Sequence, residues 1–325
     1  MLIERSKCCF VFARKLGIFR QTLFHPNVFD QLYMHRLEND SPPELREQIQ
    51  QLLDKVTVNA WRLFLHTPHI HATTPMIRGV WGRALMRLDR SLYDQVFAGS
   101  NQQSHNLPRY IVRPAPPDPD TAPALDWILF NVDQRHGRTL WKAWDMACVM
   151  GLGSNREPFR IHRRRSLMSD NRLTGWNSWT LGDVKWPLLG DPAFVPCSLK
   201  FDVPVRLIKR GQLIRSPGFT DLITASLRRV AGLAGMSRSA VYGDLMRTAR
   251  SVANQTTAQP WAGEKCNLVR WSAAQQREVE LFGITGLVSL PKGPGFLWPL
   301  LAAAQWCHLG KGTVFGMGQI RILPY

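Results

Sequence analysis

The sequence predicts an α+β fold in which the element order β-α-β-β-α-β occurs twice. Segments with alternating apolar and polar residues indicate half-buried strands, and apolar residues spaced three and four positions apart indicate amphipathic helices. Two such units in tandem form two ferredoxin-like domains. We place an N-terminal extension at residues 1–55, a first domain at 56–195 and a second domain, with a glycine-rich loop before its last strand, at 196–325.

The extension ends in a predicted helix, ELREQIQQLLDK, and the first domain follows it directly. Proline and glycine mark the breaks between elements. The expected elements of this domain are a strand at Val56–Leu65, a helix at Pro75–Asp89, strands at 109–114 and Leu125–Asp133 around a proline-rich loop, a helix at Thr139–Gly153, and a strand at Phe159–Leu167.

The second domain repeats this order. Its first strand, SLKFDVPVRLI, alternates apolar and charged residues, as a strand with one buried face does. The expected elements are this strand at 198–208, a helix at 218–235, two strands or a bent ribbon at 269–290, a helix at Phe296–Cys307 and a last strand at 314–323. Residues Met236–Gln259 are additional, and 237–252 are expected to form an inserted helix.

The charge of the chain favours a polyanionic partner. Its formal net charge is +17 and its pI is near 10.3, which is typical of nucleic-acid-binding proteins. An acidic protein or a membrane surface is the alternative. The six cysteines are scattered without a CxxC pair, so we expect no metal site, no cofactor and a reducing cytoplasm. The most apolar run, Phe296–Cys307, is shorter than the roughly 20 residues that a membrane span needs.

The segment HLGKGTVFGMGQIRI near the C-terminus contains four glycines and one lysine. It matches neither the phosphate-binding pattern GxxxxGK[ST] nor the dinucleotide pattern GxGxxG. Glycine lets backbone amides approach a phosphate closely, and Lys311 adds a mobile positive charge. The alternative is a tight turn between helix and strand, with glycines present only for positive φ. Because four glycines in nine residues exceed what one turn needs, we favour phosphate contact.

These residues carry a resemblance to a known family. HLGKGTVFGMG resembles the C-terminal glycine-rich loop of the RAMP superfamily, in particular the CRISPR pre-crRNA-processing endoribonucleases (Cas-six-like). TTPMIRGVWGRAL, VPVRLIKRGQLI with GFTDLITASLRRV, and WSAAQQREVELFGITG follow in the order of that family. The resemblance covers roughly residues 56–325, and members of the family have two ferredoxin-like folds in tandem.

The resemblance implies an endoribonuclease that binds the hairpin of CRISPR repeat RNA and cleaves it without a metal. In that reaction the ribose 2′-hydroxyl attacks the adjacent phosphate, with a base near the hydroxyl, an acid near the leaving oxygen and cations near the developing charge. The product would be the mature guide RNA. The protein is then expected to stay bound to it and to join other subunits of a CRISPR effector complex.

The catalytic candidates are three histidines between the first strand and the first helix, where these nucleases often place a catalytic histidine, and one arginine of that helix: His66, His69, His71 and Arg83. Histidine suits proton transfer because its pKa lies near neutral pH. An ordinary surface loop is the alternative. Some archaeal relatives use a histidine after the first helix, where this chain offers Tyr93 and, further on, His105.

The RNA-binding candidates are arginines of the first domain and residues of the glycine-rich loop: Arg78, Arg160, Arg163, Arg164, Arg165, His308, Gly310, Lys311, Gly312, Thr313, Gly316 and Gly318. Arginines in a strand cannot all face the core, and beside a net charge of +17 they favour contact with RNA phosphates over a solvated edge. Two other functions remain open. One is a RAMP subunit that binds guide RNA without cutting it, and the other is a basic assembly protein.

Overall fold

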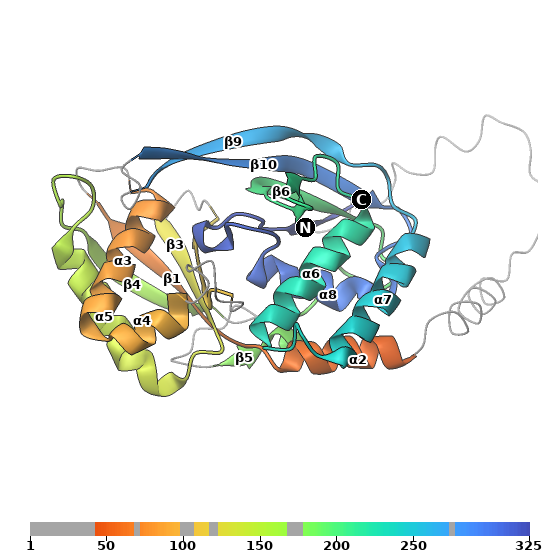
Figure 1. The fold of residues 1–325 in the computed structure, drawn as a ribbon, viewed down its shortest axis with the longest axis horizontal. Helices are drawn as coiled ribbons and strands as arrows, with labels where there is room; N and C mark the ends of the chain where they lie inside the picture. Colours follow the sequence, from red (N-terminus) through yellow and green to blue (C-terminus); the bar gives the residue numbers. More distant parts are fainter. Residues whose placement is uncertain (1–42, 68–71, 98–106, 117–122, 168–177, 273–276) are drawn as a thin grey trace, which may run out of the picture. The chain divides into compact units, whose positions relative to one another are not determined.

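The computed structural model describes residues 43–67, 72–97, 107–116, 123–167, 178–272 and 277–325 (Figure 1). Residues Pro43–Tyr325 form one compact unit. Most of the predicted N-terminal extension, residues 1–42, lies outside the described residues. None of the helices within the described ranges combines the length and the apolar character that a transmembrane segment requires.

The first sheet has the strand order of a ferredoxin-like unit. Its strands are β1 (Thr57–His66), β2 (Tyr110–Pro114), β3 (Ala124–Phe130) and β4 (Arg160–Leu167), and the short β5 (Trp179–Thr180) adds to β1. They lie in the order β2-β3-β1-β4, and every neighbouring pair is antiparallel. This order arises when two β-α-β crossovers interleave, so the predicted α+β class is confirmed for this half.

Three helices cover one face of this sheet: α3 (Thr74–Leu88), α4 (Arg90–Phe97) and α5 (Gly137–Met150) (Figure 1). Trp81 and Trp144 stack between the helices with ring centroids 5.5 Å apart, and Trp127 of β3 meets both edge-on. These three rings are fully buried. Buried aromatic side chains contribute large apolar areas, so this cluster is the core of the first half. Helix α4 was not predicted from the sequence.

The second sheet repeats the same topology. It contains β6 (Cys197–Val205), β9 (Ala262–Ser272), β10 (Arg277–Leu290) and β11 (Arg321–Pro324) in the antiparallel order β11-β6-β10-β9. Helices α6 (Phe219–Leu233) and α8 (Trp298–Cys307) pack beneath it, and α7 (Ala240–Gln255) is the expected inserted helix (Figure 1). The short strands β7 (Ile208–Lys209) and β8 (Gln212–Leu213) form a small hairpin after β6.

Within the described residues, the remaining elements are one helix and four 3₁₀ turns: α2 (Pro43–Asp54), η1 (Gln134–His136), η2 (Leu181–Asp183), η3 (Gly295–Leu297) and η4 (Thr313–Phe315). Helix α2 buries Leu45, Ile49 and Leu53 in the same core as helices α6 and α8. That core also contains residues of the first sheet, among them Ile128 and Phe130. The two halves therefore share one hydrophobic core, and the domain boundaries at residues 55 and 195 stay a prediction.

The last strand is shorter than predicted. We expected residues 314–323 to form it, but only Arg321–Pro324 pair with β6. Before them, η4 and a series of left-handed glycines take up the segment. Positive φ does not fit an extended strand, so the glycines of this segment end the regular structure early.

Candidate nucleic-acid interface

The glycine-rich loop connects α8 to β11 and is held by the backbone of the second half. The Lys311 amide donates a hydrogen bond to the Arg206 carbonyl at 2.9 Å, and the Gly318 amide donates to the Pro204 carbonyl at 2.9 Å. The Leu309 amide donates in turn to the Gly318 carbonyl at 2.9 Å. The loop is thus closed on itself and joined to the end of β6.

All four glycines of this loop have positive φ. At Gly318, where φ is 75°, a Cβ atom would lie 1.9 Å from the Leu309 carbonyl oxygen. At Gly310 it would lie 2.4 Å from the Arg206 carbonyl oxygen. Both distances are far below contact, so the fold of the loop itself requires these glycines. The turn that we considered as the alternative therefore accounts for Gly310 and Gly318. The predicted phosphate contact, to which the exposed Lys311 would contribute, stays a prediction.

The tip of the loop packs on the first half of the protein. Val314 is buried in the core formed by α3, α5 and the first sheet. Gly316 lies against the backbone of Arg113, where a Cβ atom would meet the Arg113 Cβ at 3.0 Å. The Arg78 guanidinium lies 4.9 Å from the centroid of the Phe315 ring and donates to the Tyr110 hydroxyl. Arg78 is thus half-buried among aromatic rings.

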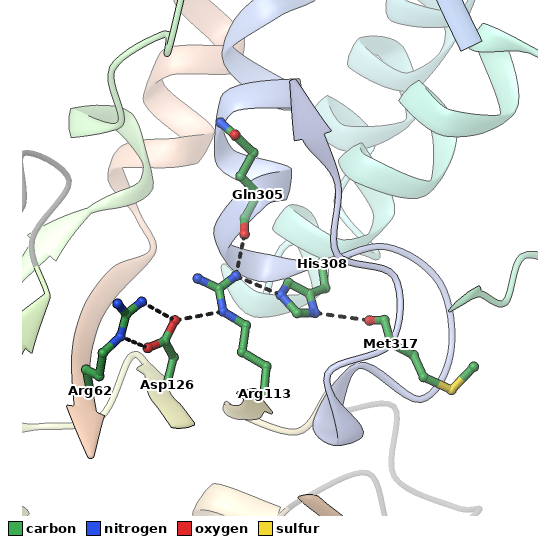
Figure 2. A network of polar contacts seen from close by, with 6 residues as sticks. All are labelled: Arg62, Arg113, Asp126, Gln305, His308 and Met317. Atoms are coloured by element: carbon green, nitrogen blue, oxygen red, sulfur yellow. Dashed lines mark hydrogen bonds and ion pairs between the residues drawn. The ribbon is translucent and has the colours of Figure 1, made fainter. Parts of the chain in front are cut away.

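A buried polar network connects the loop to the first sheet (Figure 2). Arg62 Nε donates to Asp126 Oδ1 at 2.8 Å, and Arg113 Nε donates to Asp126 Oδ2 at 3.2 Å. The other end of the Arg113 side chain reaches the second half. Its Nη1 donates to the Gln305 carbonyl at 2.9 Å and lies 3.1 Å from Nε2 of His308. Nδ1 of His308 lies 3.0 Å from the Met317 carbonyl oxygen.

These contacts fix the protonation state of His308. An arginine can only donate, so Nε2 of His308 accepts, and Nδ1 carries the hydrogen that is donated to Met317. The imidazole is therefore neutral. Burial, and next the positive charge of Arg113, hold the pKa of His308 well below its ordinary value. The side chain is fully buried and contacts protein groups in this structure, so the RNA contact expected of His308 stays a prediction. Thr313, Gly316 and Gly318 are also buried.

The arginines of β4 divide between the two faces of the first sheet. Arg165 lies directly opposite Arg62, and Arg163 lies opposite Phe64 with its guanidinium 5.1 Å from the ring centroid. Arg160 lies opposite His66. Because partners in a sheet share a face, these arginines lie on the face that carries Asp126. Arg164 points to the other face, where its guanidinium lies 4.4 Å from the centroid of the Trp141 ring.

The structure describes two of the four catalytic candidates. His66 is the exposed last residue of β1, and Arg83 is exposed on α3. His69 and His71 lie outside the described residues, as does His105. Tyr93 stacks on Phe97 within α4, with ring centroids 4.5 Å apart. Among the described residues, no group of three His, Cys, Asp or Glu side chains is arranged to hold a metal ion.

Sequence reasoning missed three residues of the network, Arg62, Arg113 and Asp126. A signal for them exists. Asp126 is the one charged residue of the apolar strand ALDWILF, and Arg113 lies in the apolar strand YIVRP. A charge within a buried strand requires a partner, but the sequence does not say which one.

Two ferredoxin-like units in tandem, the second with a glycine-rich loop before its last strand, define the class of the fold. Residues 199–320, which span β6 to the end of this loop, match the family model described as CRISPR-associated endoribonuclease Cas6. For this part of the chain, the predicted resemblance to the CRISPR endoribonucleases is thereby confirmed. No curated protein matches the sequence of the chain.

Solved Cas6 structures share the fold of most of the chain. The Cas6 (TTHB231) product complex aligns with a TM-score of 0.54 and 16% identity, covering 82% of this chain and 100% of that chain. The Cas6 (TTHA0078) product complex aligns with a TM-score of 0.51 and 16% identity, covering 82% of this chain and 99% of that chain. Cas6 (TTHB231) of Thermus thermophilus aligns with a TM-score of 0.51 and 13% identity, again covering 82% of this chain and 99% of that chain.

Gly318→Ala is expected to destabilise the protein. A left-handed backbone at a non-glycine residue costs about 1–3 kcal/mol, and the clash with Leu309 adds to this cost. Gly243→Ala in α7 is the matched control, because no atom lies within 4 Å of the added Cβ. That change should stabilise the helix by about 0.5–1 kcal/mol. Urea unfolding of both variants measures the difference. Equal stabilities would contradict the close packing of the loop.

His308 should make the stability of the protein depend on pH. Folding keeps its imidazole neutral, so the folded state takes up its proton at lower pH than the unfolded state. The stabilisation is complete above the unfolded pKa of about 6.5 and is lost as the pH falls below it, by up to about 1.4 kcal/mol per pH unit. Urea unfolding at pH 7.5 and 5.5 should show a smaller loss in His308→Gln than in the wild type. The exposed His66→Gln variant should retain the wild-type loss.

Proposed function

We propose that the protein is an endoribonuclease that processes CRISPR repeat RNA into guide RNA. Three findings support the proposal: the match of residues 199–320 to the Cas6 family model, the tandem ferredoxin-like fold, and the basic face of the first sheet. The family description names the activity, and the basic face provides the charge that a polyanionic substrate needs.

The arrangement of charge on this face carries the proposal. Arg62 and Arg165 lie directly opposite each other on neighbouring strands, where like charges repel. In the part of the chain that the structure describes, Asp126 is the one carboxylate paired with Arg62 and Arg113, and it is fully buried. Nε of Arg165 is buried without a hydrogen-bond partner. An RNA phosphate over this face would relieve the repulsion and pair the remaining guanidinium groups.

The proposed reaction is attack of the ribose 2′-hydroxyl on the adjacent phosphate. The new O–P bond gives a 2′,3′-cyclic phosphate, and the 5′-oxygen leaves with a proton. His66 lies at the edge of the basic face, opposite Arg160, and is a candidate for proton transfer. His69 and His71 follow it in the same connection and remain candidates by sequence. Arg83 and Arg78 are the candidate cations, although Arg78 is engaged by Tyr110 and Phe315.

We further propose that the protein stays on the hairpin of its product and joins other subunits of a CRISPR effector complex in the cytoplasm. The resemblance of the sequence to the family supports this part of the proposal. Size-exclusion chromatography of the cleavage reaction would show labelled product eluting with the protein. Free product at the end of the first turnover would contradict retention.

Cleavage is expected to require the 2′-hydroxyl and no divalent metal. The purified protein is incubated in EDTA with labelled repeat RNA from its host and with the same RNA carrying one 2′-deoxy sugar at the cleavage site. The first RNA should be cut and the second should remain intact, since only the first contains the nucleophile. Tight binding without cleavage of either RNA would contradict the proposed nuclease activity and favour a RAMP subunit that only binds guide RNA.

RNA binding should depend on one face of β4. Arg163→Gln combined with Lys311→Ala should weaken binding and reduce the slope of log K against log salt by about 0.7–0.9 for each RNA phosphate that the variant no longer neutralises. Arg164→Gln combined with the same Lys311→Ala is the matched control, because the Arg164 side chain lies on the opposite face over Trp141. This control also tests the assignment of Arg164 to RNA binding, which was made from the sequence. Filter binding over a salt titration measures both. A slope that changes equally in the two variants would exclude this face as the RNA surface.

A further inference from the structure

A pocket of about 280 Å³ lies beside the glycine-rich loop, between the segment that follows β6 and the first turns of α6. It is separate from the basic face of the first sheet. Six cationic side chains line it: Arg206, Lys209, Arg228, Arg229, Arg250 and Lys311. The carboxylate in the lining is that of Asp221, and apolar side chains such as Leu207 and Ile214 form the remaining wall.

Arg229 is a buried cation in the wall of this pocket. Its side chain is 95% buried, as its residue exposure of 5% shows. Nε donates to the Cys307 carbonyl at 3.0 Å, but Nη2 is buried and has no hydrogen-bond partner. No described carboxylate forms an ion pair with it. Burial lowers the pKa of Arg229 to about 10, which leaves the group charged at neutral pH. The guanidinium lies 5.8 Å from the centroid of the Phe130 ring, but no described carboxylate balances its charge. A buried charge without a counter-ion is costly, and a bound anion would lower that cost.

Arg206 adds a second unsatisfied donor to the same pocket. Its Nε is buried without a partner. Its carbonyl accepts the hydrogen bond of the Lys311 amide at 2.9 Å and so holds the loop at the pocket. Asp221 is already engaged, because it accepts from the Gly218 amide at 3.1 Å and lies 4.0 Å from Nζ of Lys209, another cation of the lining. Asp221 thus caps the N-terminus of α6, and Arg206 and Arg229 are left without a counter-ion.

We propose that this pocket binds the phosphate group of a nucleotide. Guanidinium groups donate strong hydrogen bonds to phosphate oxygens, and Arg206 and Arg229 each keep a donor without a partner. The volume of about 280 Å³ is near the lower end of small-ligand sites and leaves room beyond the phosphate. The apolar wall would contact the sugar or base. The nucleotide can be part of the RNA, which rests on the proposed function, or a free mononucleotide.

Isothermal titration calorimetry tests the pocket directly at fixed ionic strength. Adenosine 5′-monophosphate should bind at one saturable site, and adenosine, which lacks the phosphate, should bind at least tenfold more weakly. Arg206→Gln should lower the affinity for the nucleotide by roughly tenfold or more, which is the usual effect of losing a hydrogen bond to a charged group. Arg238→Gln removes the same charge from an exposed position outside the pocket and should change the affinity less than twofold.

Absence of saturable nucleotide binding, or equal binding by the Arg206 and Arg238 variants, would overturn the proposal. Arg229→Gln provides a second measurement, although that variant also loses its bond to Cys307 and is less stable for that reason. Adding the nucleotide should raise the melting temperature of the wild type more than that of Arg229→Gln. An equal rise in both proteins counts against the pocket.

Competition with repeat RNA identifies the source of the nucleotide. Displacement of labelled adenosine monophosphate by RNA would assign the pocket to a phosphate of the RNA itself. Simultaneous binding of both would assign it to a free nucleotide. The two proposals can fail separately. RNA cleavage without nucleotide binding would disprove only the proposal that the pocket binds a nucleotide. Nucleotide binding without RNA binding or cleavage would disprove only the proposed nuclease function.

Discussion

The buried pair between Arg113 and Asp126 is the interaction on which the rest of the structure depends. Asp126 is fully buried in β3, so its charge is stable only because Arg62 and Arg113 both bind it. Removing one partner of such a buried pair typically costs about 3–5 kcal/mol. The same guanidinium reaches the end of α8 and His308. Burial and this side chain of the first sheet together keep a histidine of the second half neutral, and that histidine contacts the glycine-rich loop.

The electrostatics of the molecule follow from this arrangement. Arg62 and Arg113 share one buried carboxylate, that of Asp126. Arg165 lies opposite Arg62, and its Nε has no hydrogen-bond partner. Arg229 and Arg206 repeat the situation on the other side of the loop, where Asp221 is engaged with the start of α6. A chain with a net charge of +17 could have spread its cations over a solvated surface. Here several guanidinium groups are partly desolvated and unpaired, which is costly without an anionic ligand.

Much of the fold was predictable because it depends on local periodicity. The alternation in SLKFDVPVRLI and the helical spacing in GFTDLITASLRRV each report one buried face, and the element order then fixed the topology. The end of the last strand was not predictable in this way, because the loop that carries the left-handed glycines binds carbonyls of Arg206 and Pro204 far away in the sequence. His308 looked like a loop residue available to RNA. Its burial depends on Arg113, 195 residues earlier, and no local pattern reports such an interaction. For His69 and His71 the sequence remains the only source.

The position of Val314 has a consequence for how this chain can be divided. The residue belongs to the loop that closes the second ferredoxin-like unit, yet its side chain is part of the core of the first. A fragment ending before residue 196 would therefore lack the Val314 side chain in its core. A second unit taken from a related protein would have to provide a side chain of matching shape at this position. Sequence drift in one repeat must consequently be matched in the other, so the two repeats are expected to evolve as a pair.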